Sequence, residues 1–205
     1  MRLGIPRNTR WEDVNAWYPE NSLCRYKLHN GVIIEMPKPK GKHSEIAGFL
    51  KGRLFLEIER LQLAYFIPRE CLIQPISDES GYEPDVIVLN RQALKLEPRW
   101  DAESIITQGK SASLVVEVVS TNWSDDYALK LEEYESIGIA EYWIVDYLGL
   151  GGRRYIGNPK QPTLSVYQLV EGEYQVSQFR GDECIQSPTF PDLNLTAQRI
   201  FGTGI

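Results

Sequence analysis

The segment Ser113–Asp146, SLVVEVVSTNWSDDYALKLEEYESIGIAEYWIVD, contains the pattern that decides the fold. Its first residues, Ser113–Val119, form a nearly continuous apolar run of the kind found in a strand buried on both faces. A helix is predicted over about Ser124–Ile137, because Ser124 and two aspartates stand at its start and a glycine follows its end. Glu141–Asp146 predicts a further strand. A strand, a helical crossover and a second strand indicate a mixed sheet with helices packed against it.

Three more elements precede this segment. His43–Leu61 carries apolar residues on one side at helical spacing, which predicts a long amphipathic helix. Ala64–Gln74 and Pro84–Leu89 are bounded apolar runs and predict two strands. From His43 to Asp146 the order is therefore helix, three strands, helix, strand. This order predicts the α/β class, with an αβββαβ core built on a mixed sheet.

Shorter elements are expected on both sides of this core. Asn30-Gly31 between apolar runs predicts a hairpin, and Glu171-Gly172 predicts another. The chain has 205 residues, which fits one domain, 1–205, with its core at about 43–146. The expected flanking elements are a helix at Thr9–Tyr18 and strands at Leu23–Leu28, Val32–Met36, Leu164–Val170 and Glu173–Phe179.

The composition is that of an ordinary globular protein, with 42% hydrophobic and 24% charged residues. No stretch approaches the roughly 20 apolar residues that span a bilayer, and the first residues show no secretory signal, so a cytoplasmic protein without membrane contact is expected. The three cysteines have no paired spacing and there are only two histidines, so a zinc cluster is not indicated. Any metal would be held mainly by oxygen, which favours Mg²⁺ or Mn²⁺. The net charge of −6 argues against a broad nucleic-acid-binding surface but allows a local basic groove.

Glu117 is the first candidate site residue, because it lies inside the apolar run of a predicted buried strand. Burying an unpaired carboxylate costs several kcal/mol, so the side chain needs a cation, a metal ion or an opening to solvent. A structural ion pair, or a strand end that reaches solvent, is the alternative to a functional site.

Asp85 is the second candidate, and it is significant because it can pair with Glu117. It follows Pro84 and begins a β-branched run, where an aspartate alone is more often a turn residue. Two carboxylates on neighbouring strands repel each other, and without a cation one of their pKa values rises. A divalent ion removes this conflict, so the pair predicts a site for a hard cation.

Lys130 is the third candidate and lies on the predicted helix after Glu117. At about 100° per residue it falls in the same arc as Tyr127, Leu131 and Tyr134, which form the inward face. Its stem could cover apolar surface while the ammonium reaches solvent. The ammonium could equally reach over the sheet toward the two carboxylates.

Other polar and aromatic residues are weaker candidates for site residues. Glu35 sits in the predicted strand Val32–Met36 as a further ligand or water-orienting acid, or as an exposed strand residue. His43, on the apolar arc of its helix, is expected to make a hydrogen bond at the helix start rather than to act as a catalyst. Tyr142 and Trp143 are expected in the core or at a dimer interface, with base stacking as a minor alternative.

These residues together resemble a known family. The resemblance is carried by the following residues: Pro84-Asp85, Glu117-Val118-Val119-Ser120, Asp126, Lys130, Tyr134, Gly138 and Glu141–Asp146, with Gly31–Met36 and His43 upstream. This pattern is similar to a large bacterial family of predicted restriction endonucleases within the PD-(D/E)XK nuclease superfamily. The superfamily's usual lysine position is Val119 here, and in the resembling family the lysine has moved to the following helix, where Lys130 stands.

The resemblance implies a restriction-endonuclease-like fold and a site for phosphodiester hydrolysis in DNA. Asp85, Glu117 and the backbone carbonyl of Val118 would bind Mg²⁺ or Mn²⁺. Lys130 would orient the attacking water or neutralise charge on the phosphate, and Glu35 would be an additional acid.

Three functions compete on the sequence alone. A Mg²⁺-dependent endonuclease accounts for Asp85, Glu117 and Lys130 together. A non-catalytic nucleic-acid-binding or assembly protein could keep the same fold and suits the net charge of −6. A glycosidase would explain neither Lys130 nor the buried position of Glu117. A homodimer is expected, because cutting both DNA strands usually requires two sites.

Overall fold

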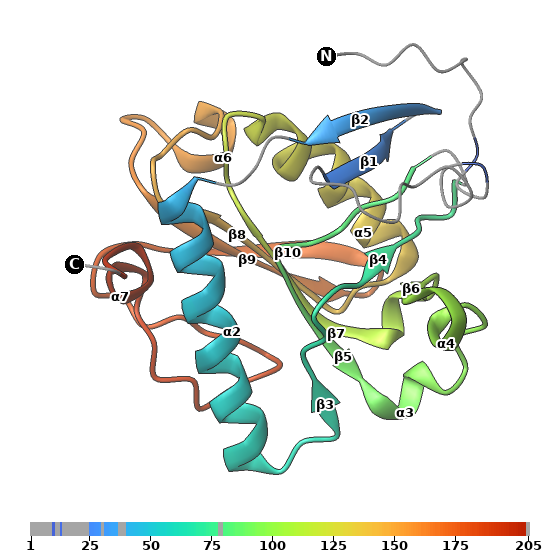
Figure 1. Ribbon diagram of the computed structural model, residues 1–205. Helices are drawn as coiled ribbons and strands as arrows, with labels where there is room; N and C mark the ends of the chain where they lie inside the picture. Colours follow the sequence, from blue (N-terminus) through green and yellow to red (C-terminus); the bar gives the residue numbers. More distant parts are fainter. Residues whose placement is uncertain are drawn as a thin grey trace.

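Two helical layers cover the opposite faces of one sheet in the computed structural model of the chain (Figure 1). The structure describes residues 10, 13, 25–29, 31–36, 40–77 and 80–203. Helix α2, Gly41–Leu61, crosses one face, and helix α5, Lys130–Ile137, lies on the other. The predicted helix at His43–Leu61 is therefore confirmed. No described helix is long and apolar enough to cross a membrane.

The main sheet has six strands in the order β10-β9-β8-β7-β5-β3. Strands β7 and β8 run parallel, because the helix between them returns the chain to the same end of the sheet, and all other neighbours are antiparallel. This arrangement confirms the predicted mixed sheet with one helical crossover. The strands are β3 Tyr65–Phe66, β5 Val86–Asn90, β7 Ala112–Val118, β8 Glu141–Asp146, β9 Thr163–Val170 and β10 Glu173–Phe179.

The crossover helix contains a wide turn that the sequence does not predict. Helical backbone begins at Trp123, and the segment η2, Asp125–Leu129, is π-helical before α5 continues it. The Asp126 carbonyl accepts a hydrogen bond from the Tyr142 hydroxyl at 3.1 Å, which satisfies it outside the usual helical ladder. Ser124 was expected to cap the helix, but it has helical dihedral angles and makes no capping hydrogen bond, so that expectation is wrong. Gly138, with φ 84°, ends the helix as predicted.

The predicted strand at Ala64–Gln74 is wrong in its extent. The chain forms β3 and then, after Pro68, a separate strand β4 at Leu72–Ile73. Proline has no N–H to continue the ladder, so the two parts pair with different partners. Strand β4 pairs in parallel with β6, Ile105–Ile106, in a small second sheet. Further short elements that the sequence did not predict are α3 Arg91–Leu94, α4 Trp100–Glu103, η1 Gly109–Ser111, α6 Arg153–Ile156 and α7 Ala197–Phe201.

Both predicted hairpins are present. Strands β1, Arg25–His29, and β2, Val32–Met36, pair with each other in a two-stranded sheet of their own. Strands β9 and β10 are joined by Glu171 and Gly172, which have φ values of 53° and 92° and so form the tight turn expected there. Apart from Arg10 and Asp13, the predicted helix at Thr9–Tyr18 lies outside the described residues, and the single-domain division stays a prediction.

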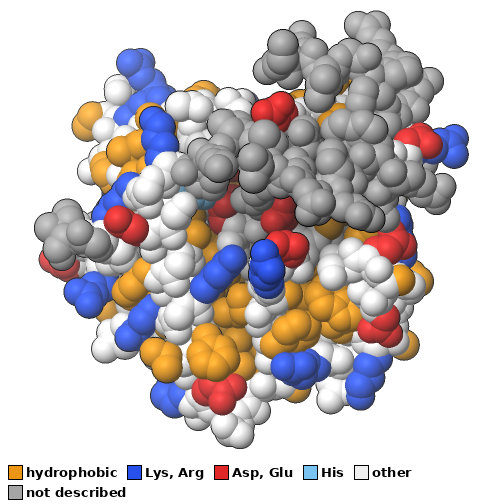
Figure 2. Space-filling view, in the orientation of Figure 1, with side chains coloured by type: hydrophobic (Ala, Val, Ile, Leu, Met, Phe, Trp, Pro, Cys, Tyr) orange, Lys and Arg blue, Asp and Glu red, His pale blue; other side chains and the backbone are white. Residues whose placement is uncertain are grey.

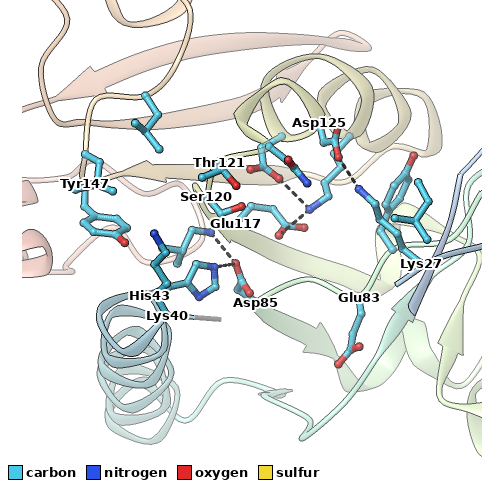
Figure 3. Close-up of a pocket in the computed structure, with 18 of the residues that line it drawn as sticks. Lys27, Lys40, His43, Glu83, Asp85, Glu117, Ser120, Thr121, Asp125 and Tyr147 are labelled. Carbon is cyan, nitrogen blue, oxygen red and sulfur yellow. Dashed lines mark hydrogen bonds and ion pairs between the residues drawn. The ribbon is translucent and has the colours of Figure 1, made fainter. Parts of the chain in front are cut away.

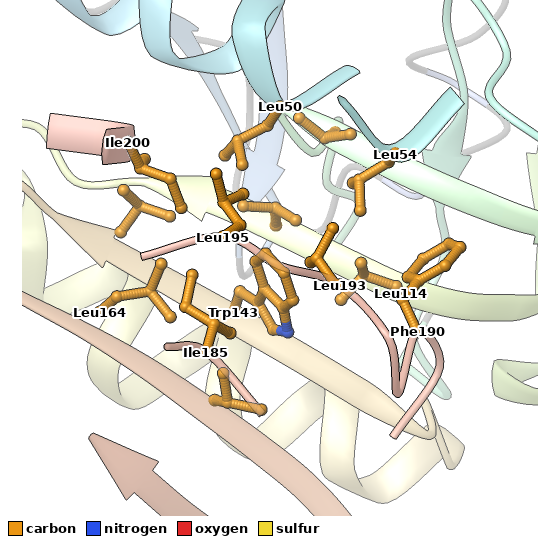
Figure 4. Packing of buried hydrophobic residues seen from close by; sticks show 14 of the residues in the cluster. Leu50, Leu54, Leu114, Trp143, Leu164, Ile185, Phe190, Leu193, Leu195 and Ile200 are labelled. Atoms are coloured by element: carbon orange, nitrogen blue, oxygen red, sulfur yellow. The ribbon is translucent and has the colours of Figure 1, made fainter. Parts of the chain in front are cut away.

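The core lies on both faces of the sheet, and this determines where the polar side chains of β7 can go. On the α2 face, Trp143 is fully buried among apolar side chains of α2, β7 and the C-terminal segment around Leu195 (Figure 4). On the α5 face, Val115 and Val119 pack in a second cluster. Because strand residues alternate between faces, Glu117 points with Val115 and Val119 toward the crossover helix. Tyr142 and Trp143 are both fully buried core residues, so neither of these two rings is available for base stacking.

Candidate active site

Asp85 and Glu117 lie side by side at one end of the sheet. Val86 pairs with Val116 in the antiparallel ladder, so extending the register by one residue brings Asp85 next to Glu117. The two strands differ in their surroundings: Asp85 directly precedes β5, whereas Glu117 is inside β7 and almost fully buried. The expectation that these two carboxylates come together is therefore met by the geometry.

Lys130 reaches this pair from the crossover helix. Its ammonium lies 2.9 Å from Glu117 Oε2 and 2.9 Å from Asp126 Oδ1, and its side chain is only 12% exposed. The ammonium is thus buried between two carboxylates and does not extend along the surface to solvent. The inward orientation that helical spacing predicts is what the structure has, and Val119 is a buried core residue.

Burial governs the protonation of this cluster. Burial, and then the charges of Asp85 and Asp126, raise the pKa of Glu117 to about 7, although Lys130 acts in the opposite direction. Burial also raises the pKa of Asp126, again against the effect of Lys130. Burial alone would lower the pKa of Lys130, but the neighbouring carboxylates outweigh it and keep the ammonium charged. One buried lysine therefore balances more than one buried acid, and the site is short of positive charge.

Asp85 is held by two donors that both approach the same oxygen. The Val118 N–H donates to Asp85 Oδ2 at 2.8 Å, and His43 Nε2 lies 3.1 Å from that oxygen (Figure 3). Burial opposes ionisation of Asp85, but His43 and the Val118 N–H outweigh it and lower the pKa of this carboxyl. Asp85 correspondingly raises the pKa of His43, against the effect of burial. Asp85 Oδ1 has no hydrogen bond within the described part of the chain, so this oxygen is available to a ligand.

A cavity of about 240 Å³ surrounds these groups. Glu35 of strand β2 lines it and is exposed, so its role as an additional acid stays a prediction. Lys27 of β1 pairs with Asp125 at the start of the π-helical segment. The Tyr134 hydroxyl donates to Glu117 Oε1 at 3.0 Å and so fixes the second oxygen of that carboxylate. Strand ends, a hairpin and two helices thus converge on one pocket.

Comparison with known proteins identifies the family. A model of the family described as "Putative restriction endonuclease", Uma2, matches residues 11–198. The chain belongs to the Uma2 family. This confirms the resemblance seen in the sequence, although no curated protein matches the chain.

The fold of this Uma2 chain also occurs in a solved structure. It is similar to a protein of Anabaena variabilis ATCC 29413, whose structure is described as that of a putative nuclease belonging to DUF820. The two share 18% sequence identity with a TM-score of 0.68, over 95% of this chain and 98% of the other. At this identity the likeness shows the fold, and it confirms the predicted α/β class with a mixed sheet.

The donor set of the Uma2 chain suits a hard divalent ion in its chemistry. Among the described residues, no three His, Cys, Asp or Glu side chains are arranged to hold a metal, and the Lys130 ammonium instead bridges Glu117 and Asp126. Asp85, Glu117 and Val118 nevertheless line one cavity, and carboxylate and carbonyl oxygens are the ligands that Mg²⁺ and Mn²⁺ prefer. The available Asp85 Oδ1 and the shortage of positive charge both fit such an ion.

Three residues of the site were missed or set aside by sequence reasoning. Asp126 precedes Lys130 by one helical turn, so its spacing was a usable signal for the ion pair. His43 was noted on the inward arc of its helix, but its partner across the sheet is not visible in the sequence. Tyr134 was expected on the buried face, and only the structure shows that its hydroxyl reaches Glu117.

Proposed function

We propose that this Uma2-family protein is a Mg²⁺- or Mn²⁺-dependent endonuclease that hydrolyses phosphodiester bonds of DNA. The observation that carries the proposal is the buried Lys130 ammonium, 2.9 Å from Glu117 and in one cavity with Asp85. A purely acidic pocket would repel a phosphate, whereas a fixed cation beside two metal-binding acids can receive one. The family membership supports a nuclease, and the metal, the DNA substrate and the residue roles are part of this proposal.

Each residue has a defined task in this proposal. Asp85, Glu117 and the Val118 carbonyl would hold the ion, which would supply polarisation of a phosphoryl oxygen and a lower pKa of a water. Lys130 orients the attacking water or neutralises the charge that develops on the phosphate oxygens, because it is charged and fixed before substrate arrives. His43 and the Val118 N–H hold Asp85 Oδ2, which leaves Oδ1 for the ion. Glu35, at the mouth, is the additional acid.

A non-catalytic nucleic-acid-binding or assembly protein is the second candidate. It is favoured by the ion pairs that Lys130 makes with Glu117 and Asp126, since the same contacts would serve a purely structural cluster. A homodimer belongs to the proposal in either case, because it would bring two sites to the two strands of a duplex.

Cleavage of plasmid DNA tests the proposal directly. Purified protein is incubated with supercoiled plasmid and with short duplexes, in Mg²⁺, in Mn²⁺ and in EDTA. Nicked or linear products are expected with either ion and not with EDTA or with Asp85→Asn. Equal behaviour of the wild-type protein and Asp85→Asn in every condition would favour the non-catalytic alternative.

Replacing His43 is expected to weaken metal binding through Asp85. His43→Phe keeps a ring but loses the donor to Asp85 Oδ2, so the Kd for Mn²⁺, measured by calorimetry, should rise by about 10- to 100-fold. His43→Gln can place an amide N–H where Nε2 lies and so keep the hydrogen bond to Asp85 Oδ2. Its Kd should therefore stay within about 3-fold of the wild-type value. Equal Kd values for the Phe variant and the wild type, at unchanged Tm, would show that His43 does not position Asp85.

Metal binding is also expected to depend on pH through Glu117. Burial raises the pKa of Glu117 to about 7 in the metal-free protein, so below that pH an ion must displace a proton from this carboxyl. The affinity for Mn²⁺ should therefore strengthen by up to about tenfold per pH unit as the pH rises toward 7, and level off above it. Proton release measured in two buffers of different ionisation enthalpy provides a check, and an affinity that is constant from pH about 5 to about 8 contradicts the expectation.

A further inference from the structure

A cluster of cations and aromatic rings lies beside the mouth of the cavity. The Arg154 guanidinium lies 4.4 Å from the centre of the Tyr155 ring, and the Lys160 ammonium lies 5.8 Å from that of Trp123. The rings of Trp123 and Tyr155 meet edge to face with their centres 6.4 Å apart. We name these four residues, Trp123, Arg154, Tyr155 and Lys160, the cation–aromatic ridge.

The ridge is continuous with the lining of the cavity. The Lys160 ammonium donates to the carbonyl of Leu150 at 2.9 Å, and Leu150 lines the cavity. Trp123 directly follows Asn122, which lines the cavity as well. In Figure 1 helix α6, which carries Arg154 and Tyr155, lies at the same end of the molecule as the start of α2. A polymer that leaves the cavity on this side would therefore pass over the ridge.

The ridge is built so that its cations face outward. Gly152 packs against Trp123 so closely that an added Cβ would lie 3.0 Å from the ring, which seats the loop on the aromatic face. Arg154 and Lys160 are exposed while the rings beneath them are partly buried. A cation over a ring keeps its N–H groups available to a phosphate while the ring restricts its orientation.

No acid in the described part of the chain neutralises these cations. Within the described ranges, neither Arg154, Lys160 nor the neighbouring exposed Arg153 takes part in an ion pair. Figure 2 shows Lys and Arg side chains along the upper left margin of the molecule, over the segment that carries α6. In a chain of net charge −6 with an acidic cavity, such a local cationic surface is what a polyanion needs in order to approach.

We propose that the cation–aromatic ridge binds the phosphate backbone of the nucleic acid whose scissile bond enters the cavity. The inference rests on the proposed function only for the choice of polymer. The recognised chemistry is the phosphodiester backbone, in a duplex or in a single strand. Arg154 and Lys160 contact phosphates, and Trp123 and Tyr155 fix their positions.

The salt dependence of DNA binding tests this assignment. Fluorescein-labelled duplex and single-stranded DNA of mixed sequence are titrated with the wild-type protein and with Arg154→Gln/Lys160→Gln, in EDTA and in Ca²⁺, at several salt concentrations. The slope of log K against log salt should fall in magnitude by about 2 for the duplex in the double variant. Each single variant should show about half of this change. The DNA form whose slope falls more in the double variant, duplex or single strand, is the form that binds along the ridge.

Arg91→Gln is the matched control. Its guanidinium also lies 4.4 Å over an aromatic ring, that of Phe66, and is exposed, but it belongs to α3 at the other end of the sheet (Figure 1). It should keep the wild-type slope. An unchanged slope in the double variant, or a wild-type protein that binds neither DNA form, overturns the ridge assignment. If the wild-type protein binds DNA through the ridge but does not cleave it, the ridge assignment stands and the nuclease proposal fails. If the protein cleaves DNA and the salt slope does not depend on the ridge, the nuclease proposal stands and the ridge assignment fails.

Discussion

Replacing Lys130 by methionine is expected to lower the free energy of unfolding of the metal-free protein by about 3–5 kcal/mol and to lower the rate of cleavage by about 10²- to 10³-fold. The ammonium bridges Glu117 and Asp126, both almost fully buried, so its removal leaves two carboxylates without a cation. Urea unfolding in EDTA measures the loss. Addition of Mn²⁺ should restore part of it, because a bound ion stabilises the folded state by mass action.

The cleavage rate separates a catalytic from a purely structural lysine. Loss of a preorganised charge at a reacting phosphate typically lowers kcat by about 10²- to 10³-fold, so the decrease should persist in Mn²⁺ even where stability recovers. Asp126→Asn is the matched control, because it removes one partner of the ammonium and leaves Lys130 and the proposed ligands in place. Its cleavage rate therefore separates the loss of one ion pair from the loss of the ammonium itself. Cleavage by Lys130→Met at the wild-type rate would remove this residue from the mechanism.

Replacing Glu117 by glutamine is expected to have the opposite effect on stability and the same effect on cleavage. Folding raises the pKa of Glu117 from 4.5 to about 7, so the stability that this proton provides is present below the unfolded value and is lost as the pH rises through about 7. Above that pH the ionised carboxylate weakens the metal-free fold. Glutamine removes the charge and should raise the free energy of unfolding by about 1–3 kcal/mol at pH about 8, while cleavage falls at least about 100-fold.

The two variants together distinguish a site from an ordinary ion pair. If Lys130 and Glu117 only stabilised the fold, both substitutions would destabilise it at pH about 8. A double variant, Lys130→Met/Glu117→Gln, should recover part of the stability that Lys130→Met loses, because fewer charges are then left unpaired. Destabilisation by Glu117→Gln at that pH would contradict the assignment of Glu117 as a functional acid whose ionised form weakens the metal-free fold.

Local patterns in the sequence were sufficient for most of the fold. The helix at His43–Leu61 and the strands on either side of the crossover follow from the spacing of apolar residues, which is a property of neighbouring residues only. The single strand expected at Ala64–Gln74 failed because its pairing partners, β5 and β6, are distant in the sequence. The π-helical turn at Asp125–Leu129 also escaped prediction, since the Tyr142 hydroxyl that donates to its Asp126 carbonyl comes from another element.

A residue of the candidate site could be predicted from the sequence where its charged side chain stood in an apolar setting. A carboxylate in an apolar strand and a lysine on an inward helical arc both require partners, so Glu117 and Lys130 could be found from the sequence. His43 carried no such conflict, because a histidine on a partly apolar helix face is ordinary. Its contact with Asp85 depends on how α2 crosses the sheet, which only the tertiary structure determines.

The ion pair between Lys27 and Asp125 connects the hairpin to the crossover helix one residue before Asp126. Asp126 in turn holds the Lys130 ammonium that faces Glu117. The hairpin forms a two-stranded sheet of its own, so the Lys27 side chain links this small sheet to the helix that carries Lys130. A run of ionic contacts thus leads from the hairpin, through two adjacent aspartates of the helix, to the buried Glu117 at the floor of the cavity.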